Sequence, residues 1–227
     1  PDGVLNILQG DGLVTGNSIV EHEKTKIISF TGSTDTGRII AKKCGSLLKK
    51  VSLELGGKNP MIICDDADLN EAVKWSILSA FSNAGQRCAS ASRIIVFEGI
   101  YEKFVKNFVN KTKLLKLGID RDSDLGPVIN KKQYIFIKEK LKKAKENGAV
   151  FLTGGNNFNS NFRKNFTGYY IYPSILSEVK INEEISQIEL FGPVTILYKV
   201  KNLSEALSIA HNSNFGLTAS IHTTNID

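Results

Sequence analysis

A cysteine in residues 81–90 (FSNAGQRCAS) has the surroundings of a nucleophile. Cys88 follows a glycine break, lies among small residues and is adjacent to a cation, Arg87. A nearby positive charge lowers the pKa of a thiol, and small neighbours leave the sulfur accessible. The segment therefore predicts a thiolate that attacks an electrophilic carbon. The alternative is a buried structural cysteine.

The other two cysteines lie in apolar patterns. Cys44 falls in a helical pattern over residues 37–48, and Cys64 closes the apolar run 61–64. Both are predicted to be small buried hydrophobic side chains. Three cysteines without metal-ligand spacing predict no metal site, and they favour a reducing, cytoplasmic environment.

An acidic residue in residues 51–60 (VSLELGGKNP) has the surroundings of a general base. Glu54 lies between two leucines in a strand pattern. Apolar neighbours are expected to desolvate its carboxyl group in part and to raise its pKa towards the range of a useful base. The same pattern is typical of an edge-strand glutamate that faces water.

Two glycine-containing turns could bind a nucleotide. Residues 30–37 (FTGSTDTG) lead from a strand pattern into a helix, whose N-terminus offers free N–H groups to a phosphate. Residues 189–194 (ELFGPV) carry a carboxylate, Glu189, that could accept protons from two hydroxyl groups. Each turn alone is equally compatible with a plain connection between elements.

Together these segments resemble the aldehyde dehydrogenase superfamily. Members carry L-E-L-G-G-K-x-P and, further along, G-Q-x-C with the nucleophile, as well as F-T-G-S-T-x-x-G and E-x-F-G-P-V. All four patterns are present here, and the resemblance covers the whole chain. It implies that Cys88 is the nucleophile and that Glu54 activates the hydrolytic water.

The resemblance also implies NAD or NADP as cofactor and a small-molecule aldehyde as substrate. Glu189 would bind the nicotinamide ribose, and Phe191 would pack by the nicotinamide ring. The aldehyde would be oxidised to a carboxylic acid through a thiohemiacetal and a thioester on Cys88. The residues expected to contact the cofactor are Gly32, Ser33, Gly37, Leu55, Glu189 and Phe191.

Two alternatives stay open at this point. One is a relative that passes the acyl group to coenzyme A, and the other is a catalytically silent protein on the same fold. Glu54 favours hydrolysis, and a silent protein would be expected to have lost Cys88 or Glu54. The G-Q-R-C form and residues 92–96 (SRIIV) also resemble members that act on semialdehydes of small dicarboxylic acids, with Arg87 as a candidate partner for a distal carboxylate.

Short apolar runs alternate with helical patterns, which predicts an α/β protein with a largely parallel sheet. The resemblance implies the end of a Rossmann-like cofactor domain in residues 1–55 and an open, mostly parallel catalytic domain in residues 56–227. The boundary is placed at Gly56-Gly57. An Asn-rich stretch, residues 156–164, predicts a surface loop. The expected strands cover residues 4–8, 26–30, 50–55, 60–64, 93–97, 150–153, 169–176, 194–200 and 218–222, and the expected helices cover residues 13–23, 34–48, 68–81, 101–115, 131–147 and 204–212.

Composition argues against two other classes of protein. The chain has 227 residues, 41% hydrophobic and 23% charged, and no apolar run approaches the roughly 20 residues of a bilayer span. The net charge of +6 falls largely on helical patterns such as residues 138–145, which predicts a solvated helix face rather than a nucleic-acid site.

The chain begins within a patterned segment and without Met, so it is expected to be a fragment. The resemblance implies that the oxyanion-hole asparagine and the residues that hold the adenosine ribose precede Pro1. It also implies a homodimer or homotetramer at full length.

Overall fold

The computed structural model describes residues 1–155 and 168–225, which form two compact units, Pro1–Gly56 and Gly57–Asp227. The α/β fold with parallel sheets that the sequence predicts is confirmed. The roles expected for residues 1–55 and 56–227 stay predictions. The Asn-rich segment, residues 156–164, lies outside the described residues.

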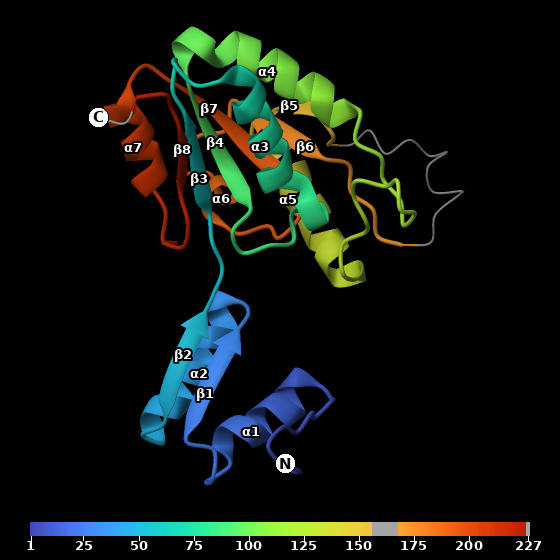
Figure 1. Cartoon of the computed structure of the whole chain (residues 1–227), viewed down its shortest axis with the longest axis vertical. Coiled ribbons are helices and arrows are strands. Elements are labelled where there is room, and N and C mark those ends of the chain that lie inside the picture. The colour runs from blue at the N-terminus through green and yellow to red at the C-terminus, as the bar shows by residue number, and fades with distance from the viewer. Residues whose placement is uncertain (156–167, 226–227) are drawn as a thin grey trace. The chain divides into compact units, whose positions relative to one another are not determined.

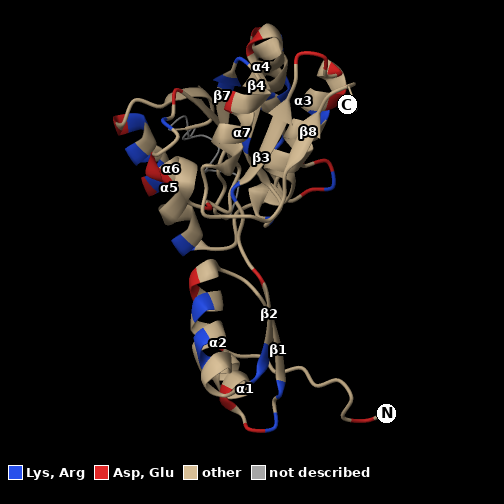
Figure 2. Ribbon diagram, turned by 90° about the vertical axis from the view of Figure 1, so that its left-hand side faces the viewer, with Lys and Arg blue, Asp and Glu red and all other residues tan. Residues whose placement is uncertain are grey.

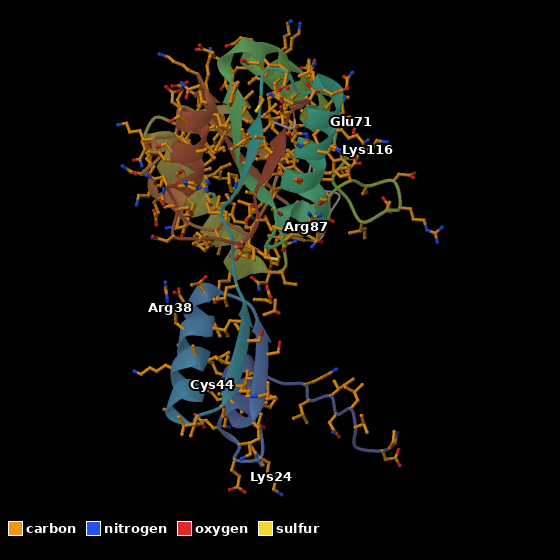
Figure 3. All side chains as sticks on the ribbon, turned by 60° about the vertical axis from the view of Figure 1, so that its left-hand side comes forward. Lys24, Arg38, Cys44, Glu71, Arg87 and Lys116 are labelled. Atoms are coloured by element: carbon orange, nitrogen blue, oxygen red, sulfur yellow. The ribbon has the colours of Figure 1, made fainter. Side chains whose placement is uncertain are left out.

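The smaller unit contains a two-stranded parallel sheet with helices beside it (Figure 1). Its core consists of Val20, Ile28 and Cys44, with Cys44 facing the strands from its helix (Figure 3). The predicted burial of Cys44 is therefore confirmed. In chain order its elements are η1 (Gly12–Gly16, a π-helical turn), α1 (Asn17–Glu21), β1 (Ile27–Thr31), α2 (Thr34–Ser46) and β2 (Lys50–Glu54).

The strand expected over residues 4–8 is wrong. This segment forms no strand, and its apolar side chains are exposed, from 67% for Leu8 to 81% for Leu5. A strand needs a neighbour that pairs with its backbone N–H and C=O groups. The two-stranded sheet of this unit pairs β1 and β2 only with each other.

The larger unit contains a six-stranded sheet in the order β5-β6-β7-β4-β3-β8 (Figure 1). All pairs are parallel except β5 with β6. The strands are β3 (Asn59–Ile63), β4 (Ala91–Phe97), β5 (Val150–Thr153), β6 (Ser174–Ser177), β7 (Val194–Val200) and β8 (Ser220–His222).

Helices cover both faces of this sheet because alternate strand residues point to opposite sides. Ile94 and Val96 pack with α3 and α4 on one face, whereas Ile95 packs with α5, α6 and α7 on the other. The helices are α3 (Leu69–Phe81), the 3₁₀ turn η2 (Ser82–Gly85), α4 (Glu98–Lys113), α5 (Lys131–Glu146), α6 (Glu184–Gln187) and α7 (Leu203–His211).

Two expectations for the larger unit need correction. The strand expected over residues 169–176 is reduced to β6, and Tyr169 only forms an isolated bridge with Val128. Pro173 precedes β6 directly and has no N–H for a ladder. Cys64 is half-buried rather than buried, and the short helix α6 was not expected.

The basic stretch 138–145 lies on α5 as predicted. Leu141 and Ala144 are buried, while Lys142, Lys143 and Lys145 are exposed. Figure 2 shows Lys and Arg positions in blue on α5, and the exposure of the three lysines confirms a solvated helix face. Within residues 1–155 and 168–225, none of the helices combines the length and the apolar character that a bilayer crossing requires.

Candidate active site

The predicted site segments of the larger unit gather at one edge of its sheet. Residues 57–58 lead into β3, residues 86–90 into β4 and residues 189–193 into β7. These three strands are parallel neighbours, so their amino ends share one edge. The structure thus brings the segments of Cys88, Glu189 and Phe191 to a common edge.

The loop that carries Cys88 follows a sharp change of chain direction after α3. Asn83, Ala84 and Gly85 all have left-handed φ angles, of 53°, 54° and 68°. Asn83 closes this turn, since its side chain donates to the carbonyl of Gln86 at 3.1 Å. Cys88 itself is exposed, as a nucleophile requires, so the alternative of a buried cysteine is wrong.

Gln86 anchors the same loop to the segment before α5. Its side-chain oxygen Oε1 accepts a hydrogen bond from the backbone N–H of Ile129 at 2.8 Å, and its side-chain nitrogen Nε2 donates to the carbonyl of Pro127 at 3.3 Å. A side-chain amide bonded to backbone on both sides holds the loop beside a second, distant segment. The sequence alone does not predict this role of Gln86, because the hydrogen-bond partners lie 43 and 41 positions away in the chain.

Arg87 is exposed at the surface next to Cys88 (Figure 3). Its guanidinium donates to the hydroxyl of Ser82 at 2.7 Å, a contact within the same loop. Arginine carries five donors in a planar fork. This exposed guanidinium therefore has donors left for an anionic group.

Glu189 is half-buried and faces the start of β3. Its Oε1 accepts a hydrogen bond from the backbone N–H of Gly57 at 3.1 Å. Burial raises the pKa of Glu189, and the hydrogen bond from Gly57 and the charge of Lys58 act in the opposite direction. Phe191 is 39% exposed, and its ring is available for a contact.

Lys58 lies between these segments and was not among the predicted site residues. Lys58 is 2% exposed, and its Nζ donates to the carbonyl of Ile185 at 2.8 Å. Burial, and then the charge of Arg93, lower the pKa of Lys58 to about 7, against an opposing effect of Glu189. The available signal was its position directly before the apolar residues of β3, although lysine side chains are rarely buried.

Asn59, the first residue of β3, was missed as well. Its side chain is 4% exposed and donates to the carbonyls of Cys88 at 2.6 Å and Ser90 at 2.9 Å. The sequence signal is a polar side chain at the start of a buried strand, which must find hydrogen-bond partners. No local pattern names those partners.

In the smaller unit the predicted residues also come together. Gly32 donates its N–H to the carbonyl of Glu54 at 3.0 Å, and Ser33 caps α2 by accepting from the N–H of Thr36 at 3.3 Å. Gly37 is buried under Leu55, since a Cβ there would lie 2.5 Å from Leu55 Cδ2. Glycine at both positions leaves backbone close to the N-terminus of α2, which suits a phosphate group.

Glu54 ends β2 with an exposed side chain, so the expected partial desolvation of its carboxyl group is wrong. The flanking leucines, Leu53 and Leu55, do not shield the carboxyl group, because successive side chains of a strand point to opposite faces. The carboxylate is open to water, as in the alternative weighed for this residue. An exposed carboxylate is compatible with a role as hydrolytic base, because such a base must reach a water molecule.

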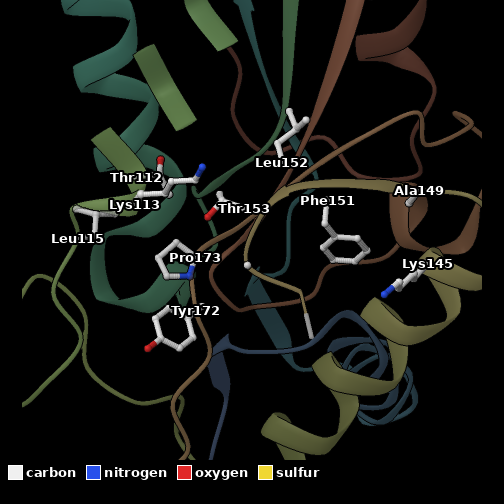
Figure 4. A pocket seen from close by; sticks show the side chains of 11 residues that line it. Thr112, Lys113, Leu115, Lys145, Ala149, Phe151, Leu152, Thr153, Tyr172 and Pro173 are labelled. Atoms are coloured by element: carbon white, nitrogen blue, oxygen red, sulfur yellow. The ribbon is translucent and has the colours of Figure 1, made fainter. Parts of the chain in front are cut away.

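A cavity of about 630 Å³ lies beside β5 (Figure 4). Thr112, Phe151 and Tyr172 are among the residues that line it. Neither Cys88 nor Glu189 nor Phe191 belongs to its lining within the described residues. This cavity is therefore separate from the segments of Cys88, Glu189 and Phe191 at the amino edge of the sheet.

The sequence of the whole chain matches a known family. The sequence model of the aldehyde dehydrogenase family matches residues 1–227. The alpha-ketoglutaric semialdehyde dehydrogenase of Bacillus subtilis is 41% identical over 228 residues, and aldehyde dehydrogenase family 2 member C4 of Arabidopsis thaliana is 42% identical over 230. These alignments cover 100% of this chain and 46% and 45% of the two relatives.

Solved structures give the same result. A betaine aldehyde dehydrogenase double mutant from Staphylococcus aureus, in complex with NAD⁺, matches with a TM-score of 0.93 and 33% identity. An NADP-dependent enzyme of E. coli matches with a TM-score of 0.92 and 35% identity. The matches cover 100% of this chain and 45% and 46% of those chains.

The chain thus spans about half the length of the relatives that it matches. The four motif segments, residues 30–37, 51–60, 81–90 and 189–194, fall within the matched residues. On this evidence the chain belongs to the aldehyde dehydrogenase family.

Proposed function

We propose that the protein oxidises a small-molecule aldehyde to a carboxylic acid with NAD or NADP, with Cys88 as nucleophile and Glu54 as hydrolytic base. The observation that carries the proposal is the exposed thiol of Cys88 on a loop whose backbone is held by Gln86 and Asn59. Family membership and the names of the relatives support it.

In the proposed reaction, the Cys88 thiolate adds to the carbonyl carbon of the aldehyde and forms a carbon–sulfur bond. Backbone N–H groups near Cys88 can stabilise the resulting oxyanion. The carbon then loses a hydride, and the thiohemiacetal becomes a thioester on Cys88. Glu54 takes a proton from a water molecule while the oxygen of that water attacks the thioester carbon. The carbon–sulfur bond then breaks, and the carboxylic acid and the thiol of Cys88 are released.

When bound, NAD or NADP would supply the acceptor for this hydride. The residues expected to hold it fit such a group in each unit. The backbone at Gly32 and Ser33 lies at the N-terminus of α2, where a phosphate is favoured. Glu189 is half-buried and has a second carboxylate oxygen for a ribose hydroxyl, and Phe191 offers an exposed ring.

We further propose an acid semialdehyde as one substrate class, with Arg87 binding its distal carboxylate. The exposed guanidinium beside Cys88 supports this proposal, as does the name of the Bacillus subtilis relative. We also expect the intact protein to be cytoplasmic and to form a homodimer or homotetramer.

The test uses the intact protein with a panel of alkanals and acid semialdehydes of matched length. Absorbance of the reduced nicotinamide is followed with each cofactor, with and without coenzyme A. We expect oxidation without coenzyme A, and we expect Cys88→Ala to abolish it while Cys64→Ala, the matched control, keeps it. Turnover that persists in Cys88→Ala would contradict the proposal, and dependence on coenzyme A would indicate acyl transfer instead of hydrolysis.

A further inference from the structure

Asn59 joins three segments of the larger unit through one side chain. Its Nδ2 donates to the carbonyl oxygens of Cys88 and Ser90, and its Oδ1 accepts from the backbone N–H of Thr218 at 3.1 Å. Every polar atom of the amide is thus engaged with backbone. The residue is 4% exposed, so these contacts are shielded from solvent.

The break in the β-ladder explains why the amide is needed. Asn59 pairs with Ala91 but Pro60 pairs with Arg93, so β4 has an extra residue at this point. Such a bulge leaves backbone groups without ladder partners, and Pro60 has no N–H to offer. The carbonyls of Cys88 and Ser90 lie just before this break and receive their hydrogen bonds from Asn59 instead.

Gly57 leaves the space for this arrangement. A Cβ at Gly57 would lie 2.7 Å from the carbonyl oxygen of Cys88 and 2.6 Å from Oδ1 of Asn59. The N–H of Gly57 meanwhile donates to Glu189. Residues 57–59 therefore hold the Cys88 loop and Glu189 from the same short stretch of backbone.

We propose that Asn59 is a positioning residue, which sets the direction of the Cys88 thiol by fixing the Cys88 carbonyl; this inference rests on the proposed function. Asn59 bonds the backbone of Cys88 and acts on the reaction only through it. A peptide plane held at its oxygen restricts the ψ angle of Cys88, and hence the direction of the Cα–Cβ bond from which the sulfur projects. A misplacement of about 1 Å at a reacting group can cost on the order of a hundredfold in rate.

The test compares Asn59→Asp and Asn59→Ser in the intact protein. The aspartate keeps the acceptor for Thr218 but turns a carboxylate towards two carbonyl oxygens, whereas serine keeps one donor. We expect kcat to fall by about tenfold to a hundredfold in Asn59→Asp and by less in Asn59→Ser, with the KM for cofactor little changed. We also expect the rate of Cys88 alkylation by iodoacetamide, measured across pH, to change more in Asn59→Asp than in Asn59→Ser.

Ser76→Ala is the control for loss of stability alone, because it removes a buried hydrogen bond, from Ser76 to the carbonyl of Ala72, on α3. Equal losses of kcat in this control and in Asn59→Asp, at equal thermal midpoints, would assign Asn59 a structural role and overturn the proposal. Wild-type alkylation and kcat in a folded Asn59→Asp would overturn it too. If Asn59→Asp does not fold, Asn59→Ser decides by the same two measurements.

The alkylation assay needs no turnover, so it separates the two proposals. A wild-type protein without aldehyde oxidation would refute the proposed function, while the alkylation rates would still test the positioning of Cys88. If the wild type oxidises aldehydes and the Asn59 variants keep its kcat and its rate of Cys88 alkylation, only the positioning role of Asn59 is refuted.

Discussion

The three cysteines differ in what surrounds each sulfur. Cys88 is exposed, Cys64 is half-buried and Cys44 is 0% exposed. Burial, together with the charges of Asp66 and Asp65, raises the pKa of the Cys64 thiol. Since the thiolate is the reactive form, the raised pKa and the partial burial of Cys64 both make its sulfur less reactive, whereas the sulfur of Cys88 is accessible.

We therefore predict that iodoacetamide labels Cys88 first, Cys64 more slowly and Cys44 only after unfolding. Labelling of Cys64 should accelerate as pH rises above neutrality, because the raised pKa shifts its thiolate to higher pH. Peptide mass spectrometry of the intact protein after timed labelling measures all three sites. Fast labelling of Cys44 in the folded protein would contradict the packing described for the smaller unit.

Glu54 presents its carboxylate to solvent at the end of β2. In Glu54→Gln we expect the first turnover to proceed and the thioester to accumulate, because in the proposed reaction only hydrolysis needs Glu54 as a base. The steady-state rate should fall by about 10²–10⁴-fold, the usual contribution of general-base catalysis. Rapid-mixing kinetics would show a burst of reduced nicotinamide followed by slow release, and loss of the burst itself would assign Glu54 another role.

At the scale of elements, the loop between α3 and β4 depends on close backbone packing. Gly85 has a φ of 68°, and a Cβ there would lie 2.1 Å from the carbonyl oxygen of Gly192. A side chain at this position meets backbone rather than a flexible side chain. The Cys88 loop and the residue after Phe191 thus touch through two glycines.

Gly85→Ala is predicted to push these two segments apart. We expect a loss of at least about 1 kcal/mol in the free energy of unfolding, since alanine is strained at positive φ and the contact is with backbone. Aldehyde oxidation should fall further than stability alone explains. Gly126→Ala is the matched control, because a Cβ at Gly126 meets nothing within 4 Å. Equal free energies of unfolding and equal rates of aldehyde oxidation in the two variants would contradict the packing described for this loop.

At the scale of the whole molecule, Lys58 links folding to pH. The pKa of Lys58 is lowered from 10.5 to about 7 in the folded chain, mainly by burial, with Arg93 adding to the shift and Glu189 opposing it. Between these two pH values the unfolded chain binds one more proton than the folded chain. Stability therefore rises with pH across this window, by at most about 1.4 kcal/mol per pH unit.

Lys58→Met should remove this rise. The free energy of unfolding, measured by urea denaturation between pH 7 and 10, should increase with pH more steeply in the wild type than in the variant. Below pH 7 the difference should be constant, because both states then carry the proton. Lys132→Met, at an exposed position of α5, should follow the wild type. If the free energies of unfolding of the wild type and Lys58→Met differ by the same amount at every pH, Lys58 titrates as an ordinary lysine and the prediction is wrong.

Local sequence determined most elements of the fold and the types of residue that carry the chemistry. The alternation of apolar runs and helical patterns was enough to place β3, β4, β7, α3 and α5, because periodicity follows directly from strand and helix geometry. It failed for residues 4–8, since a strand exists only if another strand pairs with it.

Only the tertiary structure decided how the candidate site is held in the larger unit. Cys88, Glu189 and Phe191 share an edge because β4 and β7 are parallel neighbours, a pairing between distant parts of the chain. The hydrogen bonds from Asn59 to the Cys88 loop and from Gly57 to Glu189 join residues 29 and 132 positions apart. A side chain's local pattern carries no record of such partners, since backbone groups at distant positions are chemically alike, and only folding selects among them.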